Sequence, residues 1–222
     1  MEDGIPSGVY KRLVETLPRY ITAIYNGCLK KSIFPRRWKK ALILPIIKPG
    51  HEGSYEVSKF RPISLLDIGG KVLEKIMINR INHHLYFKDY INENQYGFRP
   101  QKNTIDAAMV IKNFVEQGLA RGEVIAIVSL DVQRAFDAAW WPEILKELRE
   151  SKCPKNIYEL VKSYFNQRSA VMATNTHRIE KDISRGCPQG SCSGPGLWNL
   201  QYNSLLQINI WIELNWWLSQ MI

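Results

Sequence analysis

The feature that most constrains the fold is an unbroken run of apolar and small residues, "VIAIVSL", from Val124 to Leu130. A run of this length between charged residues predicts a strand buried on both faces. The next residue, Asp131, would then lie at the end of a strand where sheets of α/β proteins present ligand-binding groups. With a second carboxylate nearby it could hold Mg²⁺. The alternative is that Asp131 or Asp137 caps the helix that begins near Trp141.

Helical spacing and proline positions predict that most of the remaining chain is helical. The first thirty or so residues place apolar side chains at helical spacing, and Pro18 either divides them into two helices or begins the second. On this spacing one face would carry Val9, Leu13, Leu17, Ile21, Ile24, Tyr25 and Leu29. Capping residues and prolines predict further helices over about 71–87, 103–119, 142–150, 154–167 and 197–206.

Two other segments have the composition of strands. "ALILPII", residues 41–47, is short, rich in β-branched residues and followed by the turn signal Pro49-Gly50, so we predict a strand that ends in a flexible loop. "SAVMATNTHRIEKDIS", residues 169–184, alternates well enough to predict a hairpin. A hydrophobic share of 45% over 222 residues is typical of a folded domain, and no repeat or low-complexity linker divides it. The fold class predicted is α+β.

Charge and cysteine spacing narrow the function classes. The formal net charge of +9 favours an acidic partner such as nucleic acid or an anionic surface. The four cysteines form no CxxC pair, which indicates reduced thiols rather than a zinc site or a disulfide framework. The N-terminus lacks the apolar core of a signal peptide, and no apolar run reaches the roughly 18 residues that span a bilayer. We therefore expect an intracellular protein, nuclear or cytoplasmic, without a membrane partner.

A loop rich in glycine and proline, "GCPQGSCSGPG", occupies residues 186–196. Its glycines would let the backbone approach a ligand closely, and Gln189 offers a donor and an acceptor to a base or sugar edge. Its spacing fits neither the Walker phosphate loop nor the dinucleotide fingerprint, and a plain turn is the alternative.

Five blocks in order along the chain together resemble a known family. They are "YNGCLKKSIFPRRWKKALILPIIKPG", "FRPISLLDIGGKVLEKIMINRI", "NQYGFRPQKNTIDA", "VSLDVQRAFDAAWW" and "RGCPQGSCSGPGLWNLQYNSLL". Over residues 10–207 the chain resembles the reverse transcriptase domain of non-LTR (LINE-type) retrotransposons, particularly the arthropod kind. The resemblance implies a right-hand polymerase with fingers and a partial palm, a small incomplete antiparallel sheet and no thumb. The implied regions are an N-terminal helical extension (1–40), fingers (41–122), partial palm (123–207) and a tail outside the family (208–222).

The resemblance also implies roles for residues of the palm. Asp131 matches the first catalytic aspartate, which binds both Mg²⁺ ions together with the backbone carbonyl of Val132. Phe136 matches the aromatic steric gate, since a flat apolar ring rejects ribose by its bulk and leaves the 2′-hydroxyl without a partner. The alternative for Phe136 is a core residue, and Asp137 is either structural or a second carboxylate of the site.

Other roles implied by the resemblance concern the nucleotide and the template. Lys48 and Arg61 match the cations that fingers contribute to the incoming triphosphate, although by charge alone both would be solvated surface residues. Gln189 and Gly190 match the motif that lines the nucleotide and template beside the primer end. Three residues match the segment that supports the template, with buried packing as the alternative for the phenylalanine: Gln95, Phe98 and Arg99. The implied partners are an RNA template, a DNA primer and deoxynucleoside triphosphates, with no protein partner.

The expected catalytic set is incomplete in this sequence. Two-metal phosphoryl transfer requires a cluster of aspartates, and the family supplies two of them from an aromatic-small-Asp-Asp hairpin. No two aspartates are adjacent in the 222 residues, and the tail holds three of the seven tryptophans between Trp211 and Trp217. We expect a chain truncated before that hairpin, whose tail is either a reading-frame change or an amphipathic anchor.

Three functions remain open from the sequence. The first is an RNA-directed DNA polymerase domain that is inactive as this chain. The second is a non-catalytic remnant that binds nucleic acid through its basic surface. The third is an unrelated α/β protein whose glycine-rich loop holds a small anion.

Overall fold

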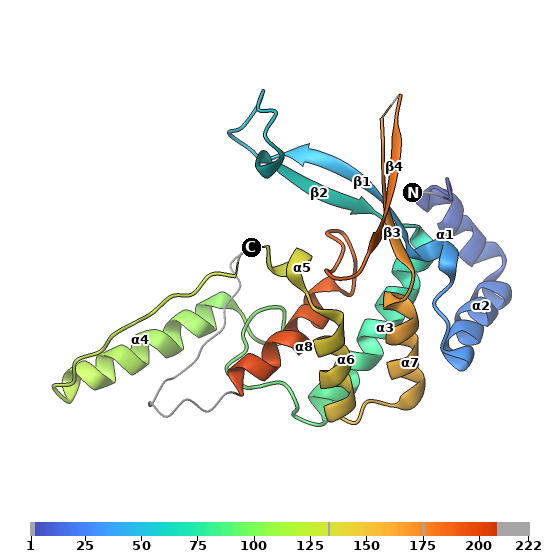
Figure 1. Cartoon of the computed structure of the whole chain (residues 1–222). Coiled ribbons are helices and arrows are strands. Elements are labelled where there is room, and N and C mark those ends of the chain that lie inside the picture. Colours follow the sequence, from blue (N-terminus) through green and yellow to red (C-terminus); the bar gives the residue numbers. More distant parts are fainter. Residues whose placement is uncertain (1–2, 133, 175, 208–222) are drawn as a thin grey trace.

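The computed structural model describes residues 3–132, 134–174 and 176–207, so the tryptophan-rich segment at 208–222 lies outside the described residues. Helices and one small sheet form its body (Figure 1). The helices are α1 (Ser7–Thr16), α2 (Pro18–Lys31), α3 (Ile68–Phe87), α4 (Thr104–Ala120), α5 (Ala135–Ala138), α6 (Trp141–Glu150), α7 (Lys155–Phe165) and α8 (Gly194–Leu206), with 3₁₀ turns η1 (Arg36–Lys39) and η2 (Val57–Lys59). The strands are β1 (Lys40–Ile47), β2 (Phe60–Leu65), β3 (Arg168–Ala173) and β4 (Arg178–Ile183).

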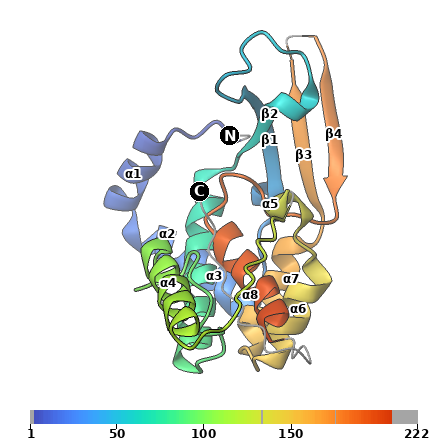
Figure 2. The same ribbon diagram turned by 90° about the vertical axis from the view of Figure 1, so that its left-hand side faces the viewer.

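The sheet is mixed rather than antiparallel, which corrects the expectation. Its strand order is β2-β1-β3-β4, in which two antiparallel hairpins are joined by parallel pairing of β1 with β3. Strand β1 pairs with β3 in parallel at Lys40–Leu42 and Ser169–Val171, and both strands lead away from the helical body (Figure 2). One sheet therefore contains strands from both the expected fingers region and the expected palm region.

Strand β2 was not predicted, because Pro62 makes "FRPIS" look like part of a loop. Pro62 lies opposite Pro45 of β1 in the antiparallel register. Proline lacks the amide hydrogen that a ladder uses, but an edge strand tolerates it, and β2 is at the edge of the sheet. The predicted strand at 41–47 and the predicted hairpin at 169–184 are both confirmed.

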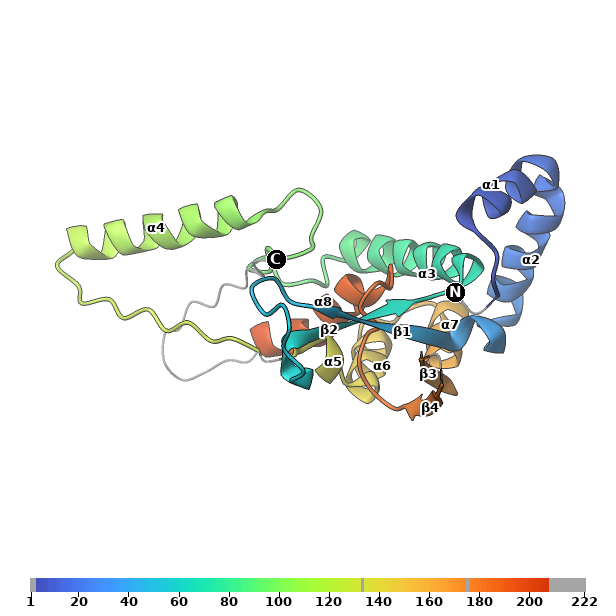
Figure 3. The same ribbon diagram turned by 90° about the horizontal axis from the view of Figure 1, so that it is seen from above.

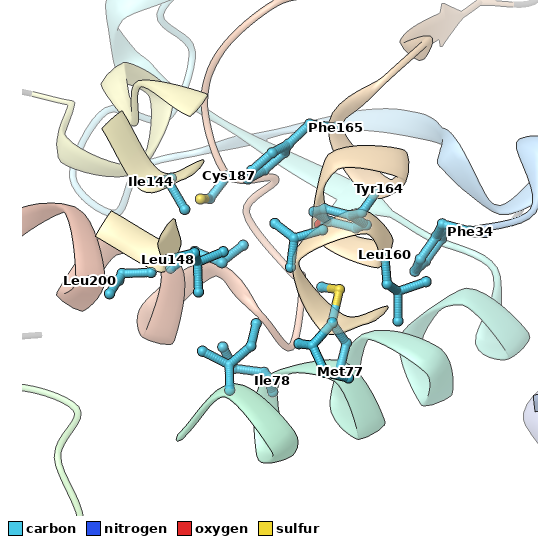
Figure 4. Close-up of a cluster of buried hydrophobic side chains, with 14 of the residues drawn as sticks. Phe34, Met77, Ile78, Ile144, Leu148, Leu160, Tyr164, Phe165, Cys187 and Leu200 are labelled. Atoms are coloured by element: carbon cyan, nitrogen blue, oxygen red, sulfur yellow. The ribbon is translucent and has the colours of Figure 1, made fainter. Parts of the chain in front are cut away.

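The core lies below the sheet, where α3, α6, α7 and α8 pack together (Figure 4). Trp141 of α6 stacks on Phe165 of α7 with 4.9 Å between ring centroids. Fully buried aliphatic side chains of these helices fill the remaining space, among them Leu73, Met77, Ile144, Leu148, Leu160 and Leu200. Among the residues that the structure describes, no helix is both long and apolar enough to cross a membrane.

Most helix boundaries follow from local signals. Pro18 occupies the first turn of α2, and Pro142 the first turn of α6. Helix α8 begins at Gly194, three residues before the predicted start. The apolar face predicted for the N-terminal helices is only partly buried: Tyr25 and Leu29 are in the core, whereas Val9, Leu17 and Ile24 are exposed.

The strand predicted at 124–130 does not form. The segment is extended coil beside α4, and the two form an arm that projects from the body (Figure 3). Val124 is 100% exposed and Val128 is 79% exposed, while Ile125 lies against Gly118 of α4. A strand buried on both faces requires neighbouring strands and covering layers. Within the described part of the chain the sheet consists of β1 to β4, and none of them pairs with this segment.

Candidate functional site

The glycine-rich loop is joined to α5 by backbone hydrogen bonds. The amide of Cys187 donates to the carbonyl of Phe136 at 2.7 Å, and the amide of Gly186 donates to the carbonyl of Ala139 at 2.7 Å. Gly186 has a φ of +90°, and a Cβ there would lie 2.9 Å from the carbonyl oxygen of Asp137. Only glycine combines this backbone conformation with so close an approach. The loop is therefore held against the residues that follow Asp131.

The middle of the same loop lies against the sheet. The amide of Ser64 in β2 donates to the carbonyl of Gln189 at 2.7 Å. Gly190 has a φ of +110°, and a Cβ there would lie 2.8 Å from the carbonyl oxygen of Ser64. The loop thus occupies part of the outer edge of β2, the strand that also carries Arg61.

Three aromatic rings meet beside this loop. The ring centroid of Phe136 lies 6.2 Å from that of Phe98 and 6.2 Å from that of Trp198 in α8. Phe98 has a φ of +51° and is 37% exposed. The side-chain amide of Asn199 donates to the carbonyl of Gly97 at 2.8 Å, which holds this segment against α8. Phe136 itself is half-buried, so its ring contributes to packing and still reaches the surface.

Of the other two residues predicted to support the template, Gln95 is buried and Arg99 is half-buried. Gln95 is fully buried, and neither atom of its side-chain amide has a hydrogen-bond partner among the described residues. Arg99 donates from Nη1 to the carbonyl of Asn92 at 2.8 Å, and its guanidinium carbon lies 5.9 Å from the ring centroid of Tyr86. Burying a side-chain amide without hydrogen-bond partners costs free energy, and for Gln95 no described hydrogen bond offsets that cost.

Lys48 and Arg61 lie on the β1-β2 hairpin. The ammonium of Lys48 donates to the carbonyl of Ser58 at 2.9 Å, so it also closes the loop that connects the two strands. Arg61 pairs in register with Ile46 and is exposed. The hairpin extends above the helical body (Figure 1).

Asp131 and Val132 are exposed residues of the coil that leads into α5, rather than the end of a buried strand. Neither Asp131 nor Asp137 caps α6, whose N-cap residue is Trp140 and has no side-chain cap. No group of three or more metal-ligating side chains is assembled among the described residues. A pair of Mg²⁺ ions needs several carboxylate oxygens at close range. The residues in place therefore do not fit a two-metal centre.

The sequence reading missed a buried polar cluster behind the loop. Glu74 of α3 accepts hydrogen bonds from the hydroxyl of Tyr164 and from the amide of Cys192, each at 2.9 Å. Burial raises the pKa of the Glu74 carboxyl, while Arg168 and these hydrogen bonds oppose that rise. The available signal was its spacing, because Glu74 lies three and four residues before the buried Met77 and Ile78.

Cys187 is the cysteine nearest Phe136 in this loop, and its thiol is buried. Burial raises the pKa of Cys187 to about 12. A thiol in this state is not a nucleophile near neutral pH, because the thiolate is the reactive form. The loop therefore contributes backbone geometry and polar groups rather than covalent chemistry at Cys187.

Comparison with known proteins places most of the chain in one family. The family described as "Reverse transcriptase (RNA-dependent DNA polymerase)" matches residues 46–212. The Pol polyprotein of the type-1 retrotransposable element R1 from Bradysia coprophila is 35% identical over 204 residues, which cover 92% of this chain and 20% of that protein. The RNA-directed DNA polymerase of the mobile element jockey from Drosophila funebris is 32% identical over 200 residues, covering 90% of this chain and 22% of that protein.

A third relative, a probable RNA-directed DNA polymerase from transposon BS of Drosophila melanogaster, is 31% identical over 199 residues. That match covers 89% of this chain and 22% of the relative. The chain thus spans about a fifth of the length of the curated relatives it matches. The similarity extends along nearly the whole chain, including the loop and the segments that meet it.

Proposed function

The chain belongs to the reverse transcriptase (RNA-dependent DNA polymerase) family, with relatives in insect retrotransposable elements, and we propose that it forms the nucleotide-binding and template-binding part of an RNA-directed DNA polymerase. One observation carries the proposal: the loop with Gln189 and Gly190 is bonded both to Phe136 and to β2, and Phe98 lies on Phe136. Segments far apart in the chain thereby line one surface.

On this surface Phe136 is the group that selects deoxyribose. A half-buried ring supported by Phe98 and Trp198 is rigid enough to exclude an added hydroxyl by contact. Gln189 supplies a donor and an acceptor beside it, and Gly190 allows the backbone to come close to the ligand. Phe136 is only half-buried, and this incomplete burial supports the assignment over a purely structural role.

The remaining assignments concern phosphates and template. Lys48 and Arg61 provide a point charge and a bidentate guanidinium for the triphosphate from the β1-β2 hairpin. The partly exposed ring of Phe98 supports the template by stacking, and the buried Gln95 and half-buried Arg99 belong to the same segment. In the terms of a right-hand polymerase, 1–40 is a helical extension, 41–122 is fingers and 123–207 is part of the palm.

Metal chemistry is the incomplete part of this proposal. Mg²⁺ would supply charge neutralisation and activation of the primer hydroxyl, and Asp131 with the carbonyl of Val132 are the groups assigned to it. These two groups do not make up a two-metal site with any described neighbours. We therefore propose that the polypeptide of 222 residues binds template, primer and nucleotide without joining them.

Fluorescence anisotropy on the whole chain tests the function. A labelled DNA primer on an RNA template is titrated with protein in Mg²⁺, with either the complementary deoxynucleotide or its ribonucleotide present. We expect the deoxynucleotide to tighten binding more than the ribonucleotide does, and Phe136→Ala to abolish this difference. Phe87→Ala is the matched control, because Phe87 is 80% exposed at the end of α3.

The same titration separates the proposal from its alternative. A nucleic-acid-binding remnant is favoured by the net charge of +9 and would bind the duplex through phosphates alone. Binding that does not respond to any nucleotide would support that remnant and contradict the nucleotide site. Equal discrimination by the wild type and by Phe136→Ala would remove the role of Phe136.

A further inference from the structure

A carboxylate from the helical core reaches the end of the glycine-rich loop. Glu74 of α3 is only 1% exposed. Its Oε1 accepts the hydroxyl hydrogen of Tyr164 in α7 at 2.9 Å, and its Oε2 accepts the amide hydrogen of Cys192 at 2.9 Å. One side chain therefore connects α3 and α7 with the backbone just beyond Gln189 and Gly190.

Neighbouring serines extend this connection. The hydroxyl of Ser193 donates to the hydroxyl oxygen of Tyr164 at 3.2 Å, and the amide of Gly194 donates to the hydroxyl of Ser191 at 2.9 Å. Ser193 is fully buried. The stretch from Ser191 to Gly194 is consequently fixed at the point where α8 begins, with Ser193 and Gly194 buried and Cys192 exposed.

The loop is thus attached at three places. Its start is bonded to Phe136 and Ala139, its middle is bonded to Ser64, and its end is bonded to Glu74. The backbone bonds at the first two places are not removed directly by any side-chain substitution, and at the start of the loop the indole of Trp141 also donates from Nε1 to the carbonyl of Gly186 at 2.8 Å. At the end of the loop, just beyond Gln189 and Gly190, the attachment depends on the side chain of Glu74.

We infer that Glu74 is a positioning residue, which acts through the amide of Cys192 to hold Gln189 and Gly190 in the position where they contact the nucleotide. The inference rests on the proposed function for what the loop binds, but not for the attachment itself. Filling the core does not require a carboxylate here, because a buried charge is costly and an apolar side chain of similar size would pack as well. The two hydrogen bonds account for the carboxylate, since one connects it to Tyr164 in the core and the other connects it to Cys192 in the loop.

Arg168 packs against the same group of side chains. Its side chain is buried, and its guanidinium carbon lies 4.2 Å from the ring centroid of Tyr164. Burial raises the pKa of Glu74, and the positive charge of Arg168 opposes that rise by favouring the ionised form, which can accept both hydrogen bonds. Glutamine at position 74 keeps one acceptor oxygen for Cys192, and its NH₂ group can donate to the hydroxyl oxygen of Tyr164, so Glu74→Gln can keep both contacts, whereas Glu74→Met removes both acceptors.

Hydrogen exchange followed by mass spectrometry tests the attachment in the whole chain. We expect Glu74→Met, which keeps the volume and removes both acceptors, to speed exchange in peptides covering 186–193 by roughly tenfold or more, as for loss of a hydrogen bond to a charged group. Exchange in α6 should stay at the wild-type rate. Glu116→Met, an exposed substitution on α4, is the matched control. Should Glu74→Met fail to fold, Glu74→Leu also removes both acceptors, and the same acceleration is expected.

The anisotropy titration tests the functional consequence. We expect Glu74→Met to keep binding the primer and template while losing most of the tightening caused by the deoxynucleotide. Unchanged exchange at 186–193 would overturn the attachment, and faster exchange with wild-type nucleotide dependence would overturn the positioning role. If the wild type shows no nucleotide dependence, the proposed function fails, while the exchange rates still decide whether Glu74 holds the loop.

Discussion

The ring of Phe136 meets the ring of Phe98 edge to face, with 6.2 Å between the centroids and an angle of 65° between the planes. Phe98 belongs to the segment after α3, whereas Phe136 belongs to α5. Because the glycine-rich loop is bonded to the backbone of Phe136, the ring pair couples this segment to the loop. Two residues singled out separately in the sequence thus form one contact at the candidate site.

This contact should be measurable as a coupling energy. We expect a double-mutant cycle of Phe98→Ala and Phe136→Ala to give about 0.5–1.5 kcal/mol of favourable coupling, the usual range for aromatic pairs. Urea unfolding of the wild type, the two single variants and the double variant supplies the four free energies of unfolding. Strictly additive losses would show that the rings do not interact in solution.

The unassembled metal site leads to a prediction about catalysis. We expect the purified polypeptide to give no primer extension with Mg²⁺ or Mn²⁺, because no group of three or more metal-ligating side chains is assembled among the described residues, Asp131 included. A radiolabelled primer on an RNA template, resolved on a gel, provides the measurement. Extension that persists through purification and disappears in Asp131→Ala would contradict this expectation.

Sequence reasoning succeeded where the determinants are local. Prolines at helix starts and the cap at Asn103 act within one turn, so the helices that they begin were predicted closely. The prediction of a strand at 124–130 was wrong, because the burial of a strand depends on neighbouring strands from elsewhere in the chain. Apolar composition does not say whether those neighbouring strands are in place. Strand β2 was missed for the related reason that Pro62 is acceptable only at a sheet edge.

The candidate site divides in the same way. The aromatic and glycine positions were predicted from the resemblance, and the structure brings Phe98, Phe136 and the loop together. The attachment through Glu74 could not be predicted, because it joins a helix to a loop residue that lies 118 positions further along the chain. Long-range hydrogen bonds of single side chains leave little periodic signal in a sequence.

The capping box of α4 gives a stability prediction. The side chain of Asn103 accepts from the amides of Ile105 and Asp106, and the carboxylate of Asp106 accepts from the amide of Asn103. We expect Asn103→Ala to lower the stability of α4 by about 1 kcal/mol, seen as faster amide exchange in the first turns of the helix. Asn113→Ala, at an exposed position in the same helix, is the control and should not accelerate exchange.

A buried carboxylate on α6 gives a prediction about pH. Glu147 is buried and accepts a hydrogen bond from the hydroxyl of Tyr90 at 3.0 Å. Burial raises the pKa of Glu147, and the bond from Tyr90 opposes that rise. The folded state therefore holds this proton more tightly than the unfolded state, whose glutamate pKa is about 4.3. The stabilising contribution of the protonated group is complete below that value and is lost as the pH rises through the raised pKa.

Glu147→Gln removes this titration. We expect the free energy of unfolding of the variant, relative to that of the wild type, to increase as the pH rises from about 4 and then to level off above the raised pKa of Glu147. Urea unfolding across this pH range provides the measurement. Glu93→Gln, at an exposed position, should show no such trend. A relative stability that falls with pH would mean that the pKa of Glu147 is lowered instead.

The net charge of +9 predicts that binding of single-stranded RNA depends on the salt concentration. If lysine and arginine side chains neutralise phosphates, binding releases counterions, and the affinity should fall by roughly tenfold or more between about 50 mM and about 200 mM salt. Anisotropy of labelled RNAs of equal length and different sequence should give similar salt slopes, since phosphate contacts do not read bases. Arg61→Ala is expected to reduce the slope by about one phosphate contact, because Arg61 is exposed on β2. Affinity that is insensitive to salt would place the binding energy in base stacking, and Phe98, a partly exposed ring of the candidate site, would be the next residue to test.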